Sequence, residues 1–150
     1  MKPISAVAAA VLLMAVLAAA AAADRKYIVL RRPAASNAPF SEAVLKDDTL
    51  YLSGHIGLDP QSGKPGATAE EEARLVMESL KRTLEAGGMT PEDLVSVTVF
   101  CSDVSYYDAF NSVYRTYFHD NYPARAFIGS GKLLFGARFE VQGIAVKHSK

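Results

Sequence analysis

Short stretches of alternating or β-branched apolar residues recur along the chain, and they predict a series of β-strands. The clearest lies at 94–101, where Cys101 shares one face with every second residue before it, namely Val95, Val97 and Val99. An Asp-Asp pair separates two earlier runs, as in a hairpin, and the glycines and prolines between 55 and 67 predict a loop. In chain order, the predicted strands cover residues 27–30, 43–45, 49–54, 94–101, a stretch that begins at Arg125, and 137–146.

Two further stretches have apolar residues three and four positions apart, which is the spacing of an amphipathic helix. The first follows Thr68, which has the capping-box partner Glu71, and Gly87 stops it. Its apolar stripe consists of Ala73, Val76, Met77, Leu80 and Leu84. The second is predicted from about Tyr106 to Phe118, with the stripe Phe110, Val113, Tyr114, Tyr117 and Phe118.

The order of these elements is strands, helix, strand, helix, strands, and it predicts an α+β fold with one mixed sheet. Two helices suffice to cover one face of such a sheet, so the other face stays open. This second face carries Thr98 and Phe100 and is therefore partly apolar. An uncovered apolar face favours self-association, and we expect a symmetric oligomer.

The N-terminal segment differs in composition from the rest of the chain. Lys2 is followed by an apolar run from Ile4 to Ala23, with small residues before Asp24. This is the layout of a secretory signal peptide, although the run is also long enough for an uncleaved membrane anchor. We expect residues 1–23 to be a cleaved signal, residues 24–150 to form a single domain, and the protein to be exported to the periplasm or secreted.

Charge and cysteine content narrow the function classes. The chain has 16 Lys and Arg against 16 Asp and Glu, so its formal net charge is zero. Such a balance gives no broad attraction to nucleic acid. Cys101 is the only cysteine, so the chain cannot form an internal disulfide.

Most of the familiar catalytic and metal-binding patterns are missing from the sequence. His55, His119 and His148 are far apart and have no metal-ligand spacing, so no metal site is expected. His55 is expected in a surface loop, and the other two histidines in solvent. The run Gly129–Lys132 lacks the remaining residues of a phosphate-binding loop, and there is no G-x-S-x-G motif. Cys101 has valines on its face of the strand and is expected in the core.

Arg125 and Glu140 are the candidates that remain. Arg125 begins a strand between apolar neighbours, and Glu140 lies in the middle of the last strand, where charged residues are depleted. A permanently charged guanidinium in such a place needs an anionic partner. The residues alone leave three possibilities open: Arg125 binds a carboxylate from outside, Arg125 and Glu140 pair with each other, or Glu140 and Arg138 simply face solvent.

Five stretches in this order resemble the RidA family, also called the YjgF or L-PSP endoribonuclease family. They are Asn37–Val44, Leu52–Pro60, Val97–Phe100, Tyr122–Arg125 and Glu140–Val146. The resemblance implies a chorismate-mutase-like α+β fold and a homotrimer with active clefts between subunits. It also implies hydrolysis of reactive imines and enamines, such as 2-iminobutanoate and 2-iminopropanoate, to 2-keto acids and ammonia without a cofactor.

The resemblance also assigns roles to individual residues. Arg125 would bind the substrate carboxylate through two parallel hydrogen bonds, and Glu140 would position and activate the attacking water. Ser53, the Gly54 backbone and Asn111 would complete the substrate site. The implied partners are a small imino or keto acid and further copies of this chain, with no nucleic acid, and no membrane after signal cleavage.

Two residues of the implied site depart from the family pattern. Phe127 stands where the deaminases usually have cysteine, and Phe40 stands where tyrosine is common. Three functions therefore compete: an exported imine deaminase, a non-catalytic protein that binds small carboxylates through Arg125, and an RNA-cleaving enzyme. The near-neutral charge disfavours the last, and the deaminase is the leading hypothesis.

Overall fold

A computed structural model describes residues 25–30 and 38–148 of the chain. The expected signal segment, residues 1–23, lies outside this range, so its role stays a prediction. The strands are β1 Lys26–Ile28, β2 Ala43–Lys46, β3 Thr49–Ile56, β4 Leu94–Cys101, β5 Ala124–Gly129 and β6 Phe139–Val146. The α-helices are α2 Ala69–Ala86 and α3 Tyr107–Tyr114, and short 3₁₀ turns occupy η1 Pro91–Asp93, η2 Val104–Tyr106, η3 Arg115–Tyr117 and η4 Leu134–Gly136.

The six strands form one mixed sheet in the order β1-β2-β3-β6-β4-β5. Neighbouring strands are antiparallel except for β4 and β5, which are parallel. A parallel pair needs a crossover connection, and α3 with its flanking turns supplies it. Strand β5 is consequently an edge strand, whereas β6 lies in the middle of the sheet.

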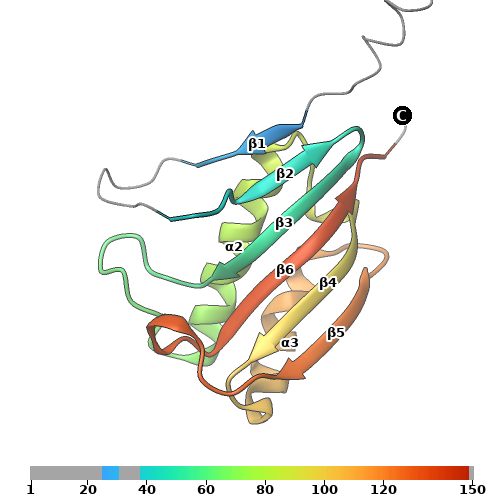
Figure 1. Ribbon diagram of the computed structural model, residues 1–150. Helices are drawn as coiled ribbons and strands as arrows, with labels where there is room; N and C mark the ends of the chain where they lie inside the picture. The colour runs from blue at the N-terminus through green and yellow to red at the C-terminus, as the bar shows by residue number, and fades with distance from the viewer. Residues whose placement is uncertain (1–24, 31–37, 149–150) are drawn as a thin grey trace, which may run out of the picture.

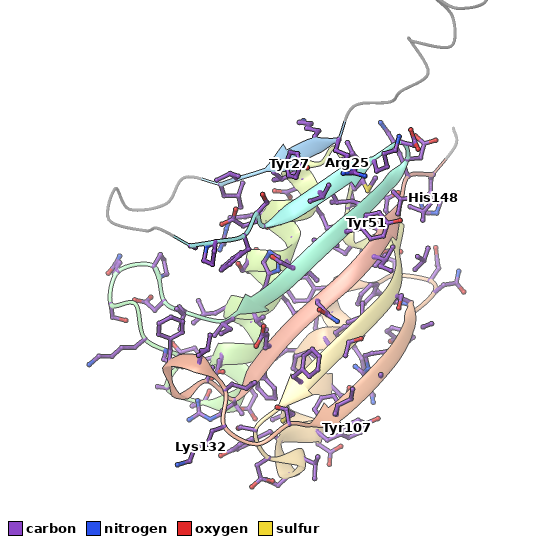
Figure 2. The ribbon with its side chains drawn as sticks, viewed as in Figure 1. Arg25, Tyr27, Tyr51, Tyr107, Lys132 and His148 are labelled. Carbon is purple, nitrogen blue, oxygen red and sulfur yellow. The ribbon has the colours of Figure 1, made fainter. Side chains whose placement is uncertain are left out.

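Both α-helices lie on the same side of the sheet (Figure 1). Alternate residues of the central strands, such as Val99 and Val141, are fully buried beneath them. No helix of residues 25–30 and 38–148 covers the opposite face, and Tyr51 projects from it (Figure 2) with half of its surface exposed, 51%. The predicted α+β fold, with one mixed sheet and two helices on one face, is therefore confirmed.

The helix boundaries are close to those expected from the sequence. Thr68 caps α2, because its hydroxyl accepts a hydrogen bond from the Glu71 backbone amide. The second helix is shorter than the predicted 106–118, since only the middle of that range is α-helical and 3₁₀ turns flank it. The apolar stripe is nevertheless buried, apart from Tyr117, which is half-buried and donates its hydroxyl to Glu78 at 2.7 Å.

One face assignment in β4 was wrong at its first residues. Leu94 is buried and Val95 is 47% exposed, the reverse of the prediction. The pairing between β4 and β6 shifts in register between Leu94 and Ser96, so strict alternation does not extend back to the strand start. From Val97 to Cys101 the predicted face is correct, and Cys101 is fully buried as expected.

Two of the three histidines are exposed as predicted. His119 lies in solvent, and the exposed His148 donates from Nδ1 to the Asp93 carboxylate at 2.7 Å. No helix within residues 25–30 and 38–148 is long and apolar enough to cross a membrane.

Candidate functional site

Arg125 lies in a hollow of about 330 Å³ between β5 and α3. Other side chains around it are Tyr107, Asn111, Tyr114, Arg115 and Tyr122. The predicted substrate-binding residues Arg125 and Asn111 are thus brought together. The hollow has two guanidinium groups and no carboxylate in its lining, so its chemistry suits an anion.

Aromatic rings hold the Arg125 side chain in place. Its guanidinium carbon lies 4.6 Å from the ring centre of Tyr114 and 5.9 Å from that of Tyr107. The ring of Phe127 is 5.8 Å away and packs edge-on against Tyr107, with their centres 5.0 Å apart. Cation–π contacts of this kind orient a guanidinium. Its N–H groups can still donate hydrogen bonds in directions where no ring lies.

No carboxylate within the described ranges forms an ion pair with Arg125. The possibility that Arg125 pairs with Glu140 inside one chain is therefore wrong. Tyr114, whose ring faces the guanidinium, is a buried neutral phenol, since desolvation raises its pKa to about 12. Within residues 25–30 and 38–148, the Arg125 guanidinium therefore contacts aromatic rings and no carboxylate.

Phe127 is absent from the lining of the Arg125 hollow. Its side chain instead turns towards α3 and packs on Phe110 and Tyr107. The substrate-binding role expected of Phe127 stays a prediction. In one chain, the phenyl group that stands in place of cysteine lies 5.8 Å from the guanidinium carbon and supports the rings around Arg125.

Glu140 lies in a second and larger hollow, of about 550 Å³. Phe40, Ser53 and Gly54 line it as well, so the other predicted site residues also come together. The Glu140 side chain rests directly on Gly54, since a Cβ added to this glycine would lie 1.9 Å from the carboxylate oxygen Oε1. The absence of a side chain at Gly54 is what allows the carboxylate to take this position.

An irregularity in β3 creates the seat for Glu140. The pairing of β3 with β6 shifts between Leu52 and His55, so Ser53 and Gly54 form a bulge. The Ser53 hydroxyl and amide both donate to the Glu42 carbonyl oxygen, 2.9 and 3.0 Å away, which ties the bulge to β2. Ser53 therefore holds the backbone of the site through this bond.

His55 was expected in a surface loop, and this expectation was wrong. It belongs to β3 and is only 5% exposed. Without the bulge, strict alternation would turn Gly54 inward after Leu52, but the extra residue turns His55 inward instead. A carbonyl can only accept, so Nδ1 donates to Ser53 O at 2.8 Å, and Nε2 lies 2.9 Å from the Thr83 hydroxyl oxygen. Burial lowers the pKa of His55 and favours the neutral form.

The two hollows lie on opposite sides of the sheet. Arg125 stacks on α3 and so lies on the helix-covered side of the edge strand β5. Glu140 alternates along β6 with Phe139 and Val141, which are buried beneath the helices, so its side chain lies on the open side. The structure therefore brings the predicted residues together as two half-sites, and one chain alone does not join them.

A buried carboxylate that sequence reasoning missed anchors the start of β6. Glu72 on α2 is completely buried, and its Oε1 accepts from the backbone amides of Arg138 and Phe139 at 2.5 and 3.0 Å. Its Oε2 accepts from the Arg138 guanidinium at 2.7 Å, and Arg138 also donates to the carbonyls of Gly66 and Ala67. Arg138 therefore does not simply face solvent. The sequence does hold one indication of this burial, because Glu72 lies on the apolar stripe of the helix, four residues before Val76.

The described ranges contain no cluster of three or more His, Cys, Asp or Glu side chains that could hold a metal ion. The buried Cys101 is unsuited to nucleophilic chemistry, since desolvation raises the pKa of its thiol. The chemical resources of the two hollows are thus a guanidinium held by aromatic rings and a carboxylate seated on a glycine.

Comparison with known proteins gives a consistent assignment. The family model described as Endoribonuclease L-PSP matches residues 30–147. A rat protein named 2-iminobutanoate/2-iminopropanoate deaminase is 40% identical over 125 residues, which cover 82% of this chain and 90% of the relative. The crystal structure of RidA from an Antarctic Psychrobacter has a TM-score of 0.75 at 29% identity, covering 81% of this chain and 99% of that one. The structure of Escherichia coli TdcF with bound serine has a TM-score of 0.74 at 28% identity, covering 82% and 100%. The chain belongs to the Endoribonuclease L-PSP family, which is also called the RidA family.

Proposed function

We propose that this protein hydrolyses reactive 2-imino acids, of the 2-iminobutanoate and 2-iminopropanoate type, to 2-keto acids and ammonia. The observation that carries the proposal is Arg125, a fixed guanidinium in a hollow whose lining contains no carboxylate. It is supported by the rat and human relatives named for this activity, which are 40% and 35% identical to the chain.

The chemistry follows from the two half-sites. The planar Arg125 fork binds the planar carboxylate of the substrate and so fixes the adjacent imine carbon in space. Glu140 orients a water and takes its proton as the oxygen attacks that carbon. Glu140 passes this proton to the nitrogen, which gives a 2-amino-2-hydroxy acid. Its hydroxyl proton is then transferred to the amine as the carbon–nitrogen bond breaks, ammonia leaves, and the 2-keto acid remains bound to Arg125 until release.

We further propose that the working form is a homotrimer in which each site combines the Arg125 hollow of one chain with the Glu140 hollow of the next. Two observations support this assembly: the half-sites lie on opposite sides of one sheet, and one face of the sheet has no helix over it. We also propose that residues 1–23 direct export, so that the enzyme works in the periplasm or outside the cell.

The Arg125→Ala variant tests the proposed activity. We expect its kcat/KM for 2-iminopropanoate to fall by at least about 10²-fold, because a charge-assisted bidentate contact to the substrate is lost. The imine is generated from alanine by an amino-acid oxidase, and semicarbazide traps what the enzyme leaves. Arg74→Ala, which removes an exposed guanidinium that lines neither hollow, is the matched control and should retain most of the activity.

A different outcome would identify the alternative function. If the wild-type protein leaves the imine untouched but pyruvate raises its melting temperature, the deaminase proposal fails. The protein is then a non-catalytic carboxylate-binding member of the fold.

Gly54→Ala tests the seat of the catalytic carboxylate. The added Cβ would occupy the position of Glu140 Oε1, so the carboxylate must move away from its water. We expect kcat to fall by about 10²-fold or more, with the fold retained, because the end of a flexible side chain can shift. Circular dichroism checks the fold. Unchanged kcat would show that the position of Glu140 on Gly54 is unimportant for catalysis.

A further inference from the structure

The hollow that contains Glu140 has an apolar wall. Besides Glu140 and the bulge in β3, its lining includes the apolar side chains Phe40, Ile56, Leu58, Leu134 and Phe135. Three of them are strongly exposed, with 56% of Phe40, 69% of Leu134 and 68% of Phe135 open. Large apolar groups so exposed, next to a carboxylate in a hollow, are typical of a ligand-binding surface.

Phe135 occupies a backbone conformation that its own side chain disfavours. Its φ and ψ angles are 59° and 12°, in the left-handed region, within the turn η4. A bulky aromatic residue there is an outlier, whereas glycine or asparagine adopts this conformation readily. The phenyl group is also mostly exposed, so it adds little to the core. Neither the turn nor the packing explains a phenylalanine at this position, and strained residues of this kind cluster at functional sites.

The size of the hollow exceeds the need of the smallest substrates. The hollow of one chain, about 550 Å³ and open to solvent on one side, has room beside Glu140 for a side chain larger than the single methyl group of 2-iminopropanoate. A methyl group close to Glu140 would leave the wall formed by Leu134 and Phe135 in contact with water. A substrate with a branched or aromatic side chain would cover that wall and displace the water.

Resting on the proposed function, we propose that the preferred substrates are 2-imino acids with large apolar side chains, of the kind formed by oxidation of leucine or phenylalanine. Leu134 and Phe135 are the specificity-determining residues, since their side chains contact that of the substrate. The reaction is the same for every side chain: water adds to the imine carbon, the carbon–nitrogen bond breaks, and ammonia and the 2-keto acid form.

The test compares imines generated by an amino-acid oxidase from leucine, phenylalanine and alanine. For the wild-type protein we expect kcat/KM to be at least about tenfold higher for the two larger imines, since each buried methylene contributes to the preference. In Phe135→Asn this ratio should fall by about tenfold, mainly through slower hydrolysis of the two larger imines. Its melting temperature should stay the same or rise, because asparagine suits the left-handed turn. Leu134→Ser should lower the ratio in the same direction.

A control variant and a binding measurement separate the possible outcomes. Val95→Asn also removes an exposed apolar side chain, and it should leave the ratio of kcat/KM values unchanged. Val95 lies near the start of β4, where this strand pairs with the end of β6 that is farthest from Glu140. Equal rates for all three imines would overturn the inference. A change in the native mass of Phe135→Asn would also overturn it, because the apolar wall would then contact another copy of the chain and not the substrate. Calorimetry measures the binding of pyruvate and 4-methyl-2-oxopentanoate, and so tests the apolar wall without turnover. Tighter binding of the larger keto acid by a protein that hydrolyses no imine would overturn the deaminase proposal alone.

Discussion

Two inactive variants, Arg125→Ala and Glu140→Gln, should regain activity when they are assembled into mixed oligomers. Each variant alone lacks one half of every site. In every mixed trimer, about a third of the sites, one of the three, joins an intact Arg125 hollow to an intact Glu140 hollow, as expected for a ring with head-to-tail contacts. We therefore expect purified mixed trimers to show about a third of the wild-type imine hydrolysis, against a loss of at least about 10²-fold for each variant alone.

The physical basis of this expectation is the position of the two side chains on the sheet. Arg125 is held on the helix-covered side by Tyr114, and Glu140 is seated on Gly54 on the open side. Reorientation of a side chain cannot move either group through a sheet of packed strands.

The measurement uses the two variants coexpressed with different affinity tags, so that only mixed oligomers are purified. Native mass spectrometry verifies their composition. The control is an oligomer of wild-type chains mixed with chains that carry both substitutions. It shows how far the activity falls when inactive chains only dilute the intact sites. Mixed oligomers of verified composition that remain inactive would contradict the composite site and require both groups to act within one chain.

Replacement of Glu72 by alanine should destabilise the fold more than any other single substitution considered for this chain. The change leaves two backbone amides, those of Arg138 and Phe139, without their acceptor, and it leaves the Arg138 guanidinium without its anionic partner. Removal of one member of a buried ion pair typically lowers the free energy of unfolding by about 3–5 kcal/mol. In a domain of this size, that corresponds to a fall in melting temperature of roughly 10 °C or more.

Thermal unfolding of the variants at one fixed protein concentration provides the measurement, because self-association makes the melting temperature depend on concentration. Glu70→Ala is the matched control, since Glu70 is an exposed acid on the first turn of the same helix. It should change the stability by less than about 0.5 kcal/mol. Similar melting temperatures for the two variants would show that water replaces the carboxylate of Glu72 without loss.

The effect of Glu72 should extend to the site. Its hydrogen bonds fix the first residues of β6, and Glu140 follows Phe139 directly. The same bonds tie the loop at Gly66 and Ala67 to this strand through Arg138. A chain with Glu72→Gln, which keeps an acceptor oxygen but lacks the charge, should therefore lose less stability than the alanine variant.

Local patterns in the sequence determined most of the secondary structure. Alternation predicts β4 and β6, and the threonine cap and glycine stop predict the ends of α2, because these signals depend on neighbours along the chain. The number of helices relative to strands also determines that one face of the sheet stays open. The motifs around Ser53, Arg125 and Glu140 pick out the site residues, because chemistry requires those side chains whatever surrounds them.

Tertiary structure alone decided how these residues are arranged. A bulge in β3 reverses the alternation after Leu52, and it both buries His55 and seats Glu140 on Gly54. The position of Glu72 on the apolar stripe of α2 marks it as unusual, but its burial depends on amides that are distant in sequence, so the stripe alone does not predict its partners. Arg125 and Glu140 lie on different sides of one sheet because strand order and register, which arise from contacts between distant segments, set the face to which each side chain points.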